Sequence, residues 1–294
     1  MLTIPELTIN WHVLEACNFN CYFCYAKYRQ KPSFQHIYKN VLLELSLLKG
    51  RVLKLKSGPV LPKSIRVNFA GGEPFLVKDL GQAIELASDL GLRPSFISNG
   101  SLITDDFISK FGKRISVAGF SIDSFSRKVN DDIGRIDNKR QQVSLERFHR
   151  IFSMFREVSP ETMIKVNTVV CRENVREDLT GPLGELKPDR WKALRVIPIH
   201  GAEGRQITDS QYKKFLERHK GVAGQVVPED NEHMHRSYLM LNPEGRFYQR
   251  EGSSFMQSEP VLQDGAAVAL RDVEFDAETY LSRYSQAKEG QKDV

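Results

Sequence analysis

Hydrophobic positions along the chain alternate between a period of two and a period near 3.6. The first period is typical of half-buried strands and the second of amphipathic helices. The two-residue period predicts six strands, over 7–14, 64–70, 94–98, 115–123, 163–170 and 191–199. The longer period predicts helices between them, over 33–50, 79–91, 105–112, 144–158 and 174–186. Six strand–helix units in this order favour a parallel sheet with right-handed crossovers.

The connections narrow this α/β class further. No glycine-rich dinucleotide turn follows the first strand, so a partial (β/α)6 barrel is favoured over a doubly wound sheet. Residues 1–200 carry the predicted barrel, and residues 130–142 are predicted to form a polar loop within it. Residues 201–294 are predicted as a C-terminal extension, with a helix over 209–221 and a hairpin over 237–249.

Composition and charge exclude several classes of protein. The chain has 294 residues, of which 40% are hydrophobic and 27% charged, as in a soluble globular protein. No signal peptide or apolar span of transmembrane length is recognised, so a cytoplasmic protein without a membrane anchor is expected. A net charge of +5 over this length does not argue for nucleic-acid binding, since a local anion pocket explains it equally well.

Three of the four cysteines lie in one short stretch, "CNFNCYFC", as Cys17, Cys21 and Cys24. This clustering is typical of reduced thiolate ligands rather than of a secreted disulfide framework. A structural zinc ion would need a fourth ligand from far away, for example Cys171. A [4Fe–4S] cluster held by three thiolates instead leaves one iron open to another ligand, which fits the spacing better.

The motif Cys-x3-Cys-x-Phe-Cys directly after a first strand resembles the radical S-adenosylmethionine (SAM) superfamily. The resemblance implies that the open iron binds SAM and that an electron from the cluster cleaves it to a 5′-deoxyadenosyl radical. It also implies the partial barrel inferred above. Tyr22, Phe23 and Tyr25 are expected to form an apolar shell that keeps water from the cluster.

A second motif, "GGEP" at 71–74, follows the next strand at the edge where barrel sites are built. Gly71 and Gly72 allow close backbone approach, and Glu73 could receive an ammonium group. At this position the motif resembles the superfamily's SAM-amine motif. Ser98 and Asn99, in "SNGSLI", are further expected SAM-binding residues.

Four predicted strands each place two polar residues, spaced by two positions, on one face. Barrel interiors usually carry branched apolar residues, so these pairs are expected to face a ligand. Four of their members are positively charged, and burying them unpaired would be costly, which implies a polyanion such as a nucleoside triphosphate. If the other face pointed inward, the pairs would lie on the helix-packed side or near solvent. The pairs are Asn10/His12, Arg66/Asn68, Lys165/Asn167 and Arg190/Lys192.

These residues and the stretches "VNFAGGEPF", "DSF", "IKVNTVV", "RWKALR" and "SYLML" resemble the viperin family, over roughly residues 10–265. The resemblance implies that Ser121 and Arg135 hold SAM. It also assigns a set of residues to the substrate triphosphate, ribose and remaining pocket: Asn10, Arg66, Lys165, Asn167, Arg190, Lys192 and Tyr238.

The family chemistry is a radical dehydration. The deoxyadenosyl radical takes the 4′-hydrogen of a ribonucleoside triphosphate and the 3′-hydroxyl then leaves as water, giving a 3′-deoxy-3′,4′-didehydro chain terminator. Tyr238 or an ordered water is the expected proton donor, and a flavodoxin- or ferredoxin-type protein the expected electron donor. CTP is the first expected substrate, and UTP or GTP stays open because "REGSSFMQSEPVLQDG" lacks the lysines of animal members.

Other functions stay open at this stage. A radical SAM enzyme acting on a peptide or another small molecule shares the cysteine motif, although auxiliary clusters would require cysteines after Cys171. A non-catalytic iron–sulfur or nucleotide sensor would be favoured by a broken motif, and both motifs are intact. An RNA-binding module would use the basic strands and show strongly salt-dependent affinity.

Overall fold

The computed structural model describes residues 1–24, 34–198, 202–222, 226–230, 236–251 and 254–282. Within them a ten-stranded sheet has the order β10-β9-β8-β7-β6-β5-β2-β11-β12-β13. Its first six strands along the chain are β2 (Leu7–Leu14), β5 (Ile65–Gly71), β6 (Arg93–Ser98), β7 (Val117–Ser121), β8 (Met163–Val170) and β9 (Arg190–Arg195). All six pair in parallel, which confirms the predicted β/α units and the parallel sheet.

The C-terminal part extends this sheet at both edges. The strand β10 (Val226–Glu229) pairs in parallel with β9, and β11 (Leu239–Leu241) pairs in parallel with β2. Beyond β11 follow the antiparallel strands β12 (Arg246–Glu251) and β13 (Ser254–Pro260). The β11–β12 turn confirms the predicted hairpin, whereas β10 was not predicted. Among the described residues the sheet therefore does not close into a complete barrel, because β10 and β13 form its two edges. The predicted domain boundary at residue 200 stays a prediction.

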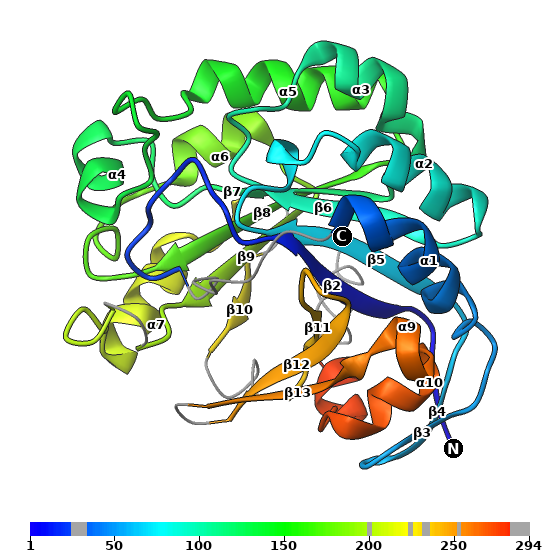
Figure 1. Ribbon diagram of the computed structural model, residues 1–294. Helices are drawn as coiled ribbons and strands as arrows, with labels where there is room; N and C mark the ends of the chain where they lie inside the picture. The colour runs from blue at the N-terminus through cyan, green and yellow to red at the C-terminus, as the bar shows by residue number, and fades with distance from the viewer. Residues whose placement is uncertain (25–33, 199–201, 223–225, 231–235, 252–253, 283–294) are drawn as a thin grey trace.

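Helices cover one face of the sheet, as Figure 1 shows. Each of these helices contacts the next one, so that together they form one layer. Their apolar sides pack on the sheet residues Trp11, Phe69, Phe96 and Phe120, which are all fully buried. The layer thus leaves the opposite face of the sheet for a site. Its helices are α1 (Phe34–Ser46), α2 (Leu80–Asp89), α3 (Asp105–Phe111), α5 (Leu145–Val158) and α6 (Thr180–Leu186).

The remaining elements are short. The helix α7 (Asp209–Arg218) precedes β10, and α9 (Val261–Asp264) and α10 (Ala266–Ala269) follow β13. A small separate sheet has the order β1-β4-β3, from Leu2–Ile4, Gly58–Pro62 and Leu53–Leu55. Single 3-10 turns are η1 (Pro74–Leu76), η2 (Gly112–Arg114) and η3 (Leu270–Asp272). In the described residues, no helix combines the length and the apolar character that crossing a bilayer requires.

Two expectations from the sequence were wrong. The stretch predicted as a polar loop begins inside α4 (Arg127–Ile133), which Ser126 caps at its start and left-handed Gly134 ends. The helix predicted over 174–186 begins only at Thr180, because the Asn174 side chain bonds the backbone of Cys171 and Asp123 and holds a turn there. In both cases side-chain hydrogen bonds to the backbone override the hydrophobic period.

Candidate functional site

The face of the sheet opposite the helices carries the polar pairs. Strand register places Asn10 beside Asn68, Lys165 beside Arg190, and Asn167 beside Lys192. Residues in register on parallel strands share a face, so the structure confirms that these pairs face away from the helix layer. We call this the inner face.

The cysteine loop begins at the end of β2 and is held by the GGEP turn. The backbone N–H groups of Gly72 and Glu73 donate to the carbonyl oxygens of Leu14 and Ala16, each at 2.9 Å. A Cβ on Gly72 would lie 1.9 Å from the Ala16 oxygen. The glycines therefore let the turn lie directly against the chain that leads into Cys17.

The end of α4 supports the other side of this loop. Asn20 and Tyr22 donate their N–H groups to the carbonyl oxygens of Gly134 and Ile133, both at 3.0 Å. Gly134 has a φ of 82°, and a Cβ there would lie 2.3 Å from the Asn20 oxygen. Only glycine meets both requirements, so the "IGR" stretch fixes the loop and then delivers Arg135 beside it.

The three thiols lie near one another, and all are free. Burial raises the pKa of Cys21 to about 12, and Arg135 opposes this rise. Burial also raises the pKa of Cys17, whose sulfur lies close enough to Cys24 for their charges to interact. Such thiols ionise readily only when a metal takes the sulfur.

Within the described residues, no three His, Cys, Asp or Glu side chains converge on one metal ion. In a [4Fe–4S] cluster each thiolate binds a different iron, so the ligands do not meet at one point. Three free thiols on one loop beside a guanidinium therefore fit this group, and Cys17, Cys21 and Cys24 would hold it.

Arg135 lies between the cysteine loop and β7. Its guanidinium pairs with the fully buried carboxylate of Asp123 and donates to the backbone oxygen of Ser121 at 3.3 Å. Asp123 in turn accepts the N–H of Val169 at 2.7 Å. Burial works against the charge of Arg135, but Asp123 and the nearby thiols raise its pKa. A pocket here is lined by Phe19, Asn99, Ser121 and Arg135, among others, so three expected SAM-binding residues come together.

The Glu73 carboxylate forms hydrogen bonds with groups of the protein. It is 1% exposed, and its carboxylate accepts from the Ser98 hydroxyl at 2.7 Å and from the backbone N–H groups of Asn99 and Phe75. Burial raises its pKa, which these bonds partly offset. The Asn99 amide donates to Asn18 at 2.9 Å. Direct contacts of Glu73, Ser98 and Asn99 with SAM stay predictions, and the structure gives them a loop-fixing role.

The four basic residues of the inner face are close enough to affect one another. Burial, followed by the charges of Lys192 and Arg66, holds the pKa of Lys165 well below its usual value, and Arg190 adds to this. In the described part of the chain Lys165 makes no hydrogen bond or ion pair, and the buried Oδ1 of Asn167 has no partner. Both side chains are half-buried, so a ligand can reach them.

Carboxylates offset two of the four charges, which the sequence pattern does not predict. Arg66 pairs with Glu6 at 2.8 Å, and Lys192 pairs with Glu229, which is 1% exposed. The Tyr238 hydroxyl donates to the same Glu229 carboxylate at 2.6 Å. The anion site is thus less positive than four unpaired charges would make it.

Two other parts of the predicted site are placed by polar contacts. The Asn10 side chain accepts from Asn68 at 3.0 Å, and Asn68 accepts from Ser95 at 3.0 Å.

Of the expected apolar shell, Phe23 is 9% exposed, whereas the Tyr22 hydroxyl donates to Glu173 at 2.5 Å. Tyr25 lies outside the described residues.

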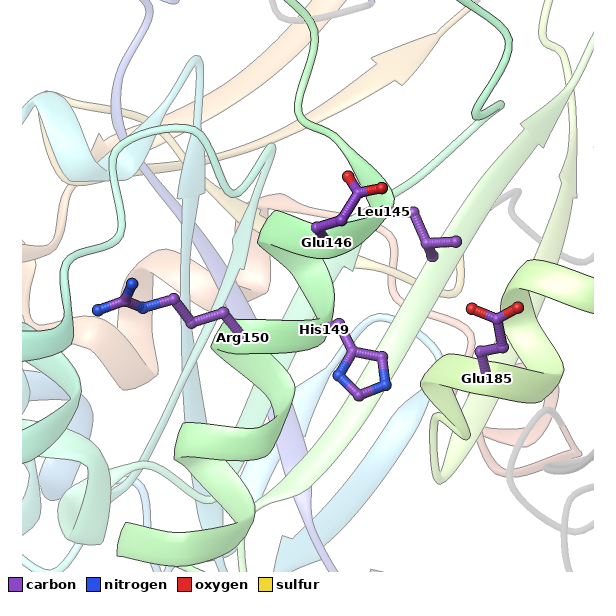
Figure 2. Close-up of a pocket in the computed structure, with 5 residues that line it drawn as sticks. All are labelled: Leu145, Glu146, His149, Arg150 and Glu185. Carbon is purple, nitrogen blue, oxygen red and sulfur yellow. The ribbon is translucent and has the colours of Figure 1, made fainter.

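A separate pocket lies between α5 and α6, lined by Leu145, Glu146, His149, Arg150 and Glu185 (Figure 2). It is on the helix-covered side of the sheet and contains none of the predicted site residues. We therefore assign the site to the inner face and the cysteine loop.

Sequence reasoning missed two buried carboxylates, Asp123 and Glu229. Asp123 could have been predicted from the sequence, because it begins the "DSF" stretch that resembles the viperin family. Glu229 lies in "VVPED", where nothing local distinguishes it from a surface glutamate, and only the pairing of β10 with β9 brings it to Lys192.

Comparisons with known proteins agree with this geometry. Residues 11–179 match the radical SAM superfamily, so the protein is a radical SAM protein. The fold is shared with two solved structures. One is Streptococcus suis SuiB bound to S-adenosylmethionine (TM-score 0.63, 16% identity, 95% of this chain and 67% of that one), and the other is native anSMEcpe with bound AdoMet (TM-score 0.62, 12% identity, 97% of this chain and 96% of that one).

Sequence relatives are more specific. An S-adenosylmethionine-dependent nucleotide dehydratase of Pseudoalteromonas ulvae is 37% identical over 293 residues, covering 97% of this chain and 94% of the relative. That of Psychrobacter lutiphocae is 34% identical, covering 96% of each. The dehydratase RSAD2 of Danio rerio is 32% identical, covering 96% of this chain and 77% of the relative. The chain belongs to this nucleotide dehydratase family, which confirms the resemblance to viperins.

Proposed function

We propose that the protein is a SAM-dependent dehydratase that converts a ribonucleoside triphosphate to its 3′-deoxy-3′,4′-didehydro analogue. The supporting observation is the pair Lys165 and Asn167 on the inner face. In the described chain Lys165 makes no hydrogen bond or ion pair, and the buried Oδ1 of Asn167 has no partner. An ammonium placed this way suits phosphate oxygens, and an amide oxygen without a partner suits a ribose hydroxyl. The names of the relatives favour a nucleotide over other polyanions.

Each half of the site has a separate task. The cluster, held by Cys17, Cys21 and Cys24, would supply the electron that cleaves SAM. Ser121 and Arg135 would hold SAM, with Arg135 oriented by Asp123. The inner-face residues would fix the triphosphate so that the ribose C4′ lies beside the reacting carbon of SAM. A low-potential protein of the flavodoxin or ferredoxin type would supply electrons.

The test is an anaerobic assay of the reconstituted enzyme with SAM, dithionite and each of the four ribonucleoside triphosphates separately. We expect one nucleotide, CTP first and UTP or GTP next, to stimulate 5′-deoxyadenosine and to lose one molecule of water by mass spectrometry. Lys165→Met should abolish this stimulation, whereas Lys110→Met, on the exposed surface of α3, should retain it. Slow and equal SAM cleavage with all four nucleotides would refute the nucleotide assignment.

A further inference from the structure

A chain of three polar groups crosses from β9 to the segment before β11. The Lys192 ammonium contacts one oxygen of the Glu229 carboxylate, and the Tyr238 hydroxyl donates to the other at 2.6 Å. The Lys192 and Glu229 side chains are only 9% and 2% exposed, whereas Tyr238 is half-buried. The three polar groups therefore lead from the buried part of the sheet toward the accessible part of the inner face.

The backbone of Glu229 is also held in place, by a tyrosine of α7. The Tyr212 hydroxyl donates to the backbone oxygen of Ala193 at 2.7 Å and lies 3.5 Å from that of Glu229. This tyrosine of α7 ties β10 to β9 at the level of the carboxylate. The two oxygens of Glu229 are thereby kept on Lys192 and Tyr238.

The Lys192–Glu229 ion pair is not by itself evidence that the fold needs these groups. Replacing a buried ion pair by apolar residues of similar volume is often neutral or stabilising, so the pair is weak evidence for stability. The neighbouring inner-face position Val227 shows that β10 can place an apolar side chain on this face, in register with Lys192. A carboxylate that bridges an ammonium and a phenol is, by contrast, a suitable path for a proton.

We propose that Glu229 is a positioning residue that aims the Tyr238 hydroxyl and relays a proton from Lys192 to the departing 3′-hydroxyl. The inference rests on the proposed function. As the C3′–O bond breaks, both of its electrons leave with oxygen, which takes the Tyr238 proton and departs as water. Glu229 passes the Lys192 proton to the phenolate, and solvent reprotonates the amine. The sugar radical cation left behind takes one electron from the low-potential donor, which yields the C3′=C4′ double bond.

The test measures a ratio rather than a rate. For wild type, Glu229→Gln, Tyr238→Phe and the double variant, we would determine the dehydrated nucleotide formed per 5′-deoxyadenosine, together with the nucleotide Kd. Glu229→Gln keeps the size of the side chain and one of its two acceptor oxygens, but it loses the negative charge and cannot carry the proton. We expect its ratio to fall roughly 10- to 100-fold, as for loss of general acid catalysis, while SAM is still cleaved. The double variant should then be no worse than Tyr238→Phe alone.

Controls separate this relay from folding and from the proposed function. Glu85→Gln, an exposed carboxylate of α2 paired with Arg114, should retain the wild-type ratio. If Glu229→Gln fails to fold, Glu229→Asp should fold and give an intermediate ratio. A wild-type ratio in whichever variant folds, or additive losses in the double variant, would overturn the relay. No dehydrated nucleotide from wild type would instead refute the proposed function.

Discussion

Gly134 offers a direct test of how α4 supports the cysteine loop. In Gly134→Ala, the left-handed backbone costs an L-residue roughly 1 to 2 kcal/mol. The new Cβ would also lie 2.3 Å from the Asn20 oxygen, and the displacement that relieves this contact adds roughly 1 to 3 kcal/mol. We therefore expect the free energy of unfolding to fall by roughly 2 to 5 kcal/mol.

A matched glycine isolates the second contribution. Gly50 has a φ of 69° but no atom within 4 Å of its added Cβ, so Gly50→Ala should lose only the roughly 1 to 2 kcal/mol of backbone cost. Gly184, in α6, has neither constraint, and alanine there should be neutral or stabilising. Because the clash falls on the backbone between Cys17 and Cys21, only Gly134→Ala should also reduce the iron bound per chain.

The assay is urea unfolding of the three variants, followed by anaerobic reconstitution and iron determination. Equal losses of stability for Gly134→Ala and Gly50→Ala, together with full iron loading of both, would show that the cysteine loop does not depend on its contact with α4.

Three further predictions concern single side chains. Asp123→Asn should weaken SAM binding roughly 10-fold or more, measured by calorimetry, because Arg135 loses its charged partner, whereas exposed Asp132→Asn should not. Asn167→Ala should lower nucleotide affinity roughly 10- to 100-fold without loss of stability, since its Oδ1 has no partner in the described chain; unchanged affinity would remove it from the site. Burial lowers the pKa of His12 to about 4, so the unfolded chain binds the extra proton and stability should fall by roughly 3 kcal/mol from about pH 6.5 to pH 4. A His12→Gln variant that shows the same pH dependence of urea unfolding would contradict this.

The sequence predicted best what local pattern determines. Strands β2 and β8 coincide with their predicted ranges. In β8 half-buried and buried residues alternate along all eight positions, which leaves little choice of register. It failed where a few side-chain bonds override periodicity, as for α4, and where a strand is too short to show a period, as for β10.

The candidate site divides in the same way. Cysteine spacing and polar pairs located its two halves, since both are local signals. The internal partners of Glu73 and the carboxylate opposite Lys192 depend on strands that meet only in the folded sheet. Tyr238 was placed by resemblance, and its contact with Glu229 could not be read from spacing along the chain.

The pairing of β11 with β2 has a consequence for biosynthesis. One edge of the first barrel strand stays unpaired until a partner about 230 positions later has been made, as the bond from Asn10 to the Leu239 oxygen illustrates. A ribosome-bound or truncated chain would therefore expose this edge of β2, and an unpaired strand edge is a known template for aggregation. We expect fragments that end near residue 200 to require chaperones or to precipitate, even though they contain the whole cysteine loop.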